Sequence, residues 1–214
     1  MEKIEAPAGV VSAAFDGPAG ADVMLVLGHG AGAGLEADFM RDIAHAVGAE
    51  GFRVCRFNFV YMELGKRAPD RQNVLEDTYS AVVDFLRPQA ATLVAGGKSL
   101  GGRIASMIAA QGAAVDGLVF LGYPLHPPGR PERIRKEHLP EIKVPMLFVE
   151  GTRDPFCPLP TLEEVRSELT APTEVAVIED GDHSLKIRKS SGRDTADAWA
   201  EAAGAVTGWL RRTF

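Results

Sequence analysis

Short apolar runs alternate along this chain with segments of helical period, and this alternation limits the folds open to it. The runs have the length of β-strands and occupy residues 23–27 (VMLVL), 53–59 (RVCRFNF), 92–96 (TLVAG), 117–122 (GLVFLG), 145–151 (PMLFVEG) and 174–179 (EVAVIE). Such near-continuous apolar runs are typical of strands covered on both faces, as in a parallel sheet.

The segments between the runs predict helices with one apolar face. Phe39, Ile43 and Val47 recur at four-residue spacing, and similar series lie in 74–86, 100–108 and 199–210. Thr161 and Glu164 have the spacing of a capping box at a helix start, and the last helix should begin near Asp194. We therefore expect a doubly wound α/β fold: a mostly parallel sheet of about six to seven strands with helices on both faces. Residues 11–17 would add an edge strand.

Composition favours one globular domain over residues 1–214, because 46% of the residues are hydrophobic and no linker-like segment divides the chain. The net charge of −6 favours neither a nucleic-acid partner nor an anionic membrane. With no apolar leader and no run near the roughly 20 residues needed to cross a bilayer, we expect a cytoplasmic protein. The two cysteines, Cys55 and Cys157, lack metal-binding neighbours, so we expect free thiols and no metal or cofactor.

The stretch VAGGKSLGGR, residues 94–103, has two possible interpretations. A phosphate-binding loop needs a glycine five residues before the Gly-Lys-Ser triplet, and Thr92 stands there instead. A nucleophile elbow needs small residues two before and two after the serine, and Gly97 and Gly101 flank Ser99 in this way. The elbow fits better, although Ser99 as a simple helix N-cap remains an alternative.

A nucleophilic serine needs a histidine base and a carboxylate, and in this kind of fold they follow the serine in the order acid, then histidine. Asp154 follows the predicted strand at 145–151, and His183 follows the predicted strand at 174–179. Because each residue lies just past a strand end, the three should meet at one edge of the sheet.

Backbone amides for an oxyanion hole should come from Leu100 and from the glycine-rich loop GHGAGAG, residues 28–34. In that loop Ala31 is the candidate, with its neighbour Gly32 left open. The same loop loosely fits a dinucleotide fingerprint, but Arg56 and Asn58 stand where an acid for the ribose is expected.

The motifs HGAGAG, GGKSLGGR, GTRDPF and GDHSL resemble those of the α/β-hydrolase superfamily, near its dienelactone-hydrolase-like members. RFNFVYME and GYPLHPPGRPE add a resemblance to a small family that includes a testis-expressed protein and a subunit of a histone-acetyltransferase complex. The resemblance implies Ser99, Asp154 and His183 as a catalytic triad, with amides near Ala31 and Leu100 as the oxyanion hole. Only about twenty residues separate the strands at 117–122 and 145–151, too few for a helical lid.

Five further residues are candidates for substrate contacts. Tyr61 and Met62 follow one strand end, Tyr123 and His126 follow another, and Lys98 precedes the proposed nucleophile, where it could attract an anionic substrate or form an internal ion pair. Together these features predict a serine hydrolase that acts on a small-molecule ester or thioester. The alternative is an interaction module that keeps the fold with little or no turnover, and the substrate and the oligomeric state stay open.

Overall fold

The computed structural model describes all 214 residues and contains one sheet of eight strands in the order β1-β2-β4-β3-β5-β6-β7-β8. Strands β3 to β8 are parallel, while β1 and β2 form an antiparallel hairpin whose second strand pairs with β4. The bounds are β1 (Glu2–Ala6), β2 (Gly9–Asp16), β3 (Val23–Gly28), β4 (Arg53–Phe57), β5 (Thr92–Lys98), β6 (Gly117–Leu121), β7 (Met146–Gly151) and β8 (Thr173–Ile178).

All six predicted runs form strands, so the predicted fold class is confirmed. The segment predicted as an edge strand forms β2, but β1 pairs with its outer side, so β2 lies second in the sheet. The eighth strand, β1, was not predicted. Its only buried side chain is Ile4, and charged residues flank it, so the strand lacks an apolar run. Charged side chains on an edge strand discourage pairing with other chains.

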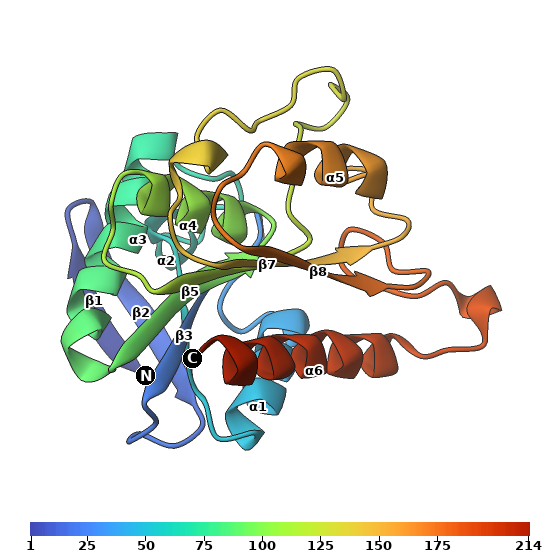
Figure 1. The fold of residues 1–214 in the computed structure, drawn as a ribbon. Coiled ribbons are helices and arrows are strands. Elements are labelled where there is room, and N and C mark those ends of the chain that lie inside the picture. Colours follow the sequence, from blue (N-terminus) through green and yellow to red (C-terminus); the bar gives the residue numbers. More distant parts are fainter.

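Helices cover both faces of the sheet (Figure 1). One face carries α1 (Asp38–Ala49) and α6 (Thr195–Thr213), which pack against each other. The other face carries α3 (Gln72–Leu86), α4 (Leu100–Ala110) and α5 (Leu159–Ser167), and the short α2 (Val60–Glu63) lies near β2. Each face has its own cluster of buried apolar side chains, so the sheet is the middle layer of three.

The helix starts agree with the sequence at one position and disagree at another. The last helix, α6, begins next to Asp194 as predicted, and the Asp194 side chain caps it by accepting a hydrogen bond from the N–H of Ala196 at 3.1 Å. The predicted capping box at Thr161 is wrong, since α5 already begins at Leu159 and Thr161 lies inside it. Pro160 sits in the first turn, where its missing N–H costs no hydrogen bond.

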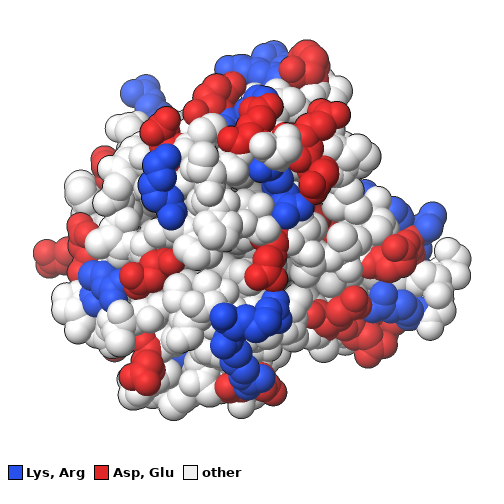
Figure 2. All heavy atoms as spheres, viewed as in Figure 1, with Lys and Arg blue, Asp and Glu red and all other residues white.

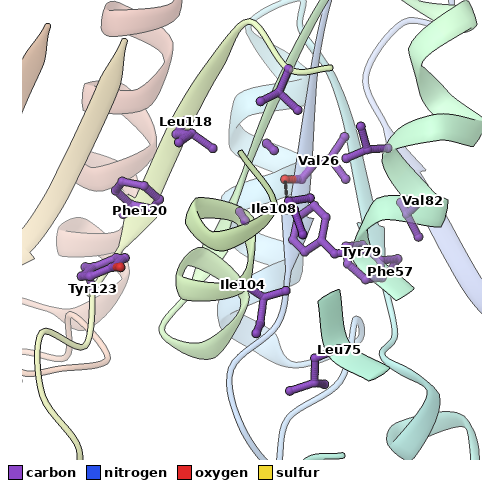
Figure 3. Close-up of a cluster of buried hydrophobic side chains, with 14 of the residues drawn as sticks. Val26, Phe57, Leu75, Tyr79, Val82, Ile104, Ile108, Leu118, Phe120 and Tyr123 are labelled. Atoms are coloured by element: carbon purple, nitrogen blue, oxygen red, sulfur yellow. Dashed lines mark hydrogen bonds between the residues drawn. The ribbon is translucent and has the colours of Figure 1, made fainter. Parts of the chain in front are cut away.

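Tyr79 of α3 points into the centre of the sheet, toward Val26 of β3 (Figure 3). Its buried hydroxyl lies 2.9 Å from the carbonyl oxygen of Val26 in β3 and accepts the N–H of Gly96 in β5 at 2.9 Å. Strand β5, which leads to residue 99, is therefore held in place by its backbone hydrogen bonds to β3 and β6 and by the buried Tyr79 side chain.

The 122–145 segment between β6 and β7 contains only one short 3-10 helix, η2 (Leu139–Glu141), so the predicted absence of a helical lid is confirmed. On the face shown in Figure 2, Lys and Arg are interspersed with Asp and Glu. No helix combines the length and the apolar character needed to cross a membrane.

Candidate active site

Ser99 occupies a sharp turn between β5 and α4. Its backbone has φ 50° and ψ −107°, a conformation with positive φ that side-chain-bearing residues rarely adopt. The hydroxyl makes no capping bond to the helix, so the N-cap alternative is wrong. Instead, Ser99 Oγ lies 2.8 Å from Nε2 of His183. The strained turn thus presents the serine side chain to a histidine from another loop.

His183 in turn contacts Asp154, so the structure brings the three predicted side chains together. Nδ1 of His183 lies 2.7 Å from Oδ2 of Asp154, whose side chain is buried. The other carboxylate oxygen, Oδ1, accepts the N–H of Phe156 at 2.7 Å. A carboxylate only accepts hydrogen bonds, so Nδ1 carries the proton and Nε2 is left to accept the Ser99 hydroxyl.

The loops after β7 and β8 are tied to each other, which positions Asp154 against His183. Thr152 Oγ1 accepts the N–H of Asp180 at 2.8 Å, and Arg153 donates to the carbonyl oxygen of Asp180 at 2.9 Å. Arg188 donates to the Asp180 carboxylate at 2.7 Å. The first two contacts join the loop after β7 to the loop after β8, and the third braces the loop after β8 itself.

The backbone N–H groups of Ala31 and Leu100, the two predicted for the oxyanion hole, have no hydrogen-bond acceptor in the protein. The neighbouring N–H of Gly32, which the sequence left open, donates to the Tyr61 hydroxyl at 3.3 Å. Ala31, Ser99 and Leu100 line one cavity. The two unpaired amides are therefore available to a negatively charged oxygen beside the serine, as an oxyanion hole requires.

His29 shapes the loop that carries Ala31. Its Nε2 accepts the N–H of Phe59 at 3.1 Å, so Nδ1 holds the proton and donates to the carbonyl oxygen of Gly30 at 2.8 Å. Burial lowers the pKa of His29 to about 4, although the bond to Gly30 opposes the shift. The ring is neutral near pH 7 and acts as a structural link between two loops.

The neutral state of His29 predicts a loss of stability in mild acid. In the unfolded chain His29 binds a proton near pH 6.5, whereas in the folded chain it binds one only near pH 4. The free energy of unfolding therefore falls as the pH drops through this window. The loss attributable to His29 should reach about 3 kcal/mol. Urea denaturation between pH 7 and pH 4.5 should show a shallower decline for His29→Gln than for the wild type. His45→Gln, at an exposed position, is the matched control; equal slopes for all three proteins would contradict the prediction.

A second serine–histidine pair joins a buried serine to a half-buried histidine. Ser106 of α4 donates to the carbonyl oxygen of Arg103 at 2.7 Å, and its oxygen lies 2.8 Å from His138 Nε2 and 3.0 Å from the Tyr123 hydroxyl. Burial lowers the pKa of His138 to about 4, and no carboxylate bonds to its ring. The Ser106 hydroxyl donates its proton to a backbone carbonyl oxygen and not to His138. His138 is therefore not placed to take that proton as a general base.

The cavity at Ser99 has a volume of about 590 Å³. Of the five residues predicted to contact substrate, Lys98 and His126 line it. Tyr61, Met62 and Tyr123 do not, which corrects the prediction. The two tyrosines are fully buried, and Met62 packs against the core, so these side chains support the loops from below. The sequence did not predict other lining residues, among them Phe39, Arg103, Arg135, Phe156 and Trp199.

Lys98 is buried behind the serine, and its Nζ has no hydrogen-bond partner. Burial lowers the pKa of this amine to about 8, while the nearby carboxylates of Asp154, Glu150 and Asp182 oppose the shift. Glu150 is fully buried as well, and burial raises its pKa well above the usual range. Lys98 therefore makes no internal ion pair, although it is buried and lines the cavity. No group of three or more His, Cys, Asp or Glu side chains is arranged to hold a metal ion.

Comparison with known proteins agrees with the fold. Similar solved structures include an α/β serine hydrolase homologue from Coxiella burnetii (18% identity, 98% of this chain and 96% of that chain, TM-score 0.77). A dienelactone hydrolase from Anabaena variabilis is also similar (18% identity, 100% of this chain and 96% of that chain, TM-score 0.78). So is a serine hydrolase without a lid from Xanthomonas campestris (20% identity, 97% of this chain and 93% of that chain, TM-score 0.75). At these identities the likeness shows the fold. The model of the α/β hydrolase domain family matches residues 21–211, and the chain therefore belongs to that family.

Proposed function

We propose that this protein is a serine hydrolase that cleaves a small carboxylic ester or thioester through an acyl-enzyme. One observation carries the proposal: two hydrogen bonds, of 2.8 and 2.7 Å, link Ser99 Oγ through His183 to the buried carboxylate of Asp154. Ser99 and His183 line a cavity together with Ala31 and Leu100, whose backbone amides have no acceptor in the protein. The names of similar structures, a serine hydrolase and a dienelactone hydrolase, support the same chemistry.

In the first half-reaction, Ser99 Oγ bonds to the substrate carbonyl carbon while its proton passes to Nε2 of His183. The carbonyl oxygen becomes negatively charged and accepts hydrogen bonds from the N–H groups of Ala31 and Leu100. Asp154 holds the His183 ring in place and stabilises its positive charge. When the tetrahedral intermediate collapses, His183 returns the proton to the alcohol or thiol that leaves.

In the second half-reaction, water replaces the leaving group. His183 Nε2 removes a proton from the water, whose oxygen attacks the acyl carbon, and the same two amides stabilise the new oxyanion. Collapse restores the Ser99 hydroxyl and releases the carboxylic acid. The cavity of about 590 Å³ suits a small substrate.

Labelling with a fluorophosphonate probe tests the proposal, because such a probe forms a stable bond only to an activated serine. The wild-type protein should be labelled on Ser99, and Ser99→Ala should not be labelled at all. Ser106→Ala is the matched control, since Ser106 also contacts a histidine, and it should be labelled like the wild type. Equal labelling of Ser99→Ala would contradict the proposal. A folded wild-type protein that is not labelled would favour the interaction module suggested by the narrower family resemblance.

A further inference from the structure

Three arginines gather beside the candidate active site. Arg103 projects from α4, and Arg133 and Arg135 come from the 122–145 segment that stands where larger hydrolases would carry a lid. All three line a second cavity of about 440 Å³. Arg103 and Arg135 line the active-site cavity too, so the two cavities adjoin at these side chains.

The three guanidinium groups make no ion pair in the structure, whereas nine arginines elsewhere in the chain do. Nη2 of Arg103 reaches only the side-chain oxygen of Gln72, at 3.5 Å, and its Nε is buried without a partner. Glu137 lines the second cavity, yet it pairs with none of the three. Within the protein, the cluster thus has one buried donor without a partner, Arg103 Nε, and no carboxylate paired with any of its guanidinium groups.

The cluster also carries an electrostatic cost. Partial burial lowers the pKa of Arg135, and the positive charges of Arg103 and Arg133 lower it further. Like charges in a partly desolvated site repel each other unless an anion lies between them. Glu137 lines the second cavity but forms no ion pair with these arginines, so their positive charge stays uncompensated within the protein and points to a ligand that supplies the negative charge.

We propose that Arg103, Arg133 and Arg135 bind an oxyanion group of the substrate, a phosphate or a carboxylate, that lies away from the reacting ester or thioester. The inference rests on the proposed function, because it places this group on the same molecule that Ser99 attacks. Arginine suits the role, since its fork of N–H donors matches the oxygens of both groups. The apolar side chains of Phe39 and Trp199, which also line the active-site cavity, would contact an uncharged part of the substrate.

Two matched substrate pairs test this inference. Acetyl-4′-phosphopantetheine is compared with acetyl-pantetheine, which lacks the phosphate, and the 4-nitrophenyl monoester of glutarate is compared with 4-nitrophenyl butyrate, which lacks the carboxylate. We expect kcat/KM to be higher for the charged member of at least one pair by about tenfold or more. The pair that shows this preference identifies the oxyanion as a phosphate or a carboxylate.

The preference should depend on the arginine cluster. Arg133→Gln and Arg135→Gln should each reduce the ratio of charged to neutral kcat/KM at least about fivefold. Arg130→Gln is the matched control, because Arg130 is exposed on the same segment and lines neither cavity. A ratio near one for both pairs, or a ratio that the two variants leave unchanged, would overturn the inference.

A binding measurement separates failure of the subsite from failure of the hydrolase. Ser99→Ala protein is titrated with pyrophosphate and with glutarate in a calorimeter, at low and at high salt. If no ester is cleaved but one of these anions binds, and binding weakens at least about fivefold when Arg135→Gln is added, the anion site stands and the hydrolase proposal fails. If neither anion binds, or if binding does not depend on Arg135, the anion site is overturned.

Discussion

Asp154→Asn is expected to lower kcat for ester hydrolysis about 10⁴-fold while leaving the fold intact. Oδ1 of Asp154 accepts the N–H of Phe156, and an asparagine at this position would keep its oxygen on that donor. Its NH₂ group would then face Nδ1 of His183 in place of the present acceptor oxygen. The ring would shift its proton to Nε2, and a protonated Nε2 cannot take the proton from Ser99.

Kinetics and a stability measurement together test this prediction. Turnover of 4-nitrophenyl butyrate should fall in Asp154→Asn to near the level of Ser99→Ala, with the urea midpoint close to that of the wild type. Glu179→Gln removes the same charge at an exposed position on the loop that carries His183, and it should retain wild-type turnover. Wild-type turnover in Asp154→Asn would show that Asp154 does not orient the base.

The candidate triad could be predicted because it depends on strand ends rather than on side-chain packing. In a parallel sheet the carboxyl ends of neighbouring strands meet at one edge, so the order of runs and loops already places Ser99, Asp154 and His183 together. The oxyanion loop could be predicted only to within a residue. Choosing between Ala31 and Gly32 required knowing that the Tyr61 hydroxyl already occupies the Gly32 N–H.

The cavity wall could not be predicted in the same way. Tyr61 and Tyr123 follow strand ends just as the candidate triad residues do, yet both rings turn inward and become part of the core. The arginine cluster joins residues from α4 and from a segment without regular structure, and no periodic pattern reports which way such side chains point. A signal was nevertheless present in the sequence: Arg130, Arg133 and Arg135 recur within six residues that contain one acid, Glu132.

Gly101 lies at the turn between β5 and α4, and Gly101→Ala should destabilise the protein by about 3 kcal/mol or more. A β-carbon on Gly101 would overlap the backbone carbonyl oxygen of Gly28. Neither the end of β3 nor the start of α4 can move away easily. Gly28 is the last residue of β3, hydrogen-bonded to its neighbour strands, and Gly101 lies in the first turn of α4, directly after the strained Ser99. Relief of the overlap would push α4 away from the sheet and carry Ser99 and the Leu100 amide with it.

A matched helix glycine provides the contrast. Gly204 lies in α6, is exposed, and has open space where a β-carbon would stand, so Gly204→Ala should stabilise the protein by about 0.5–1 kcal/mol through helix propensity alone. Urea denaturation of both variants should therefore move the midpoint in opposite directions. If Gly101→Ala folds, fluorophosphonate labelling of Ser99 should be slower than in the wild type. The Ser99 hydroxyl and the Leu100 amide would no longer be aligned to act on the same reacting group. A Gly101→Ala protein with the wild-type midpoint and labelling rate would mean that the contact between Gly28 and Gly101 does not position the serine.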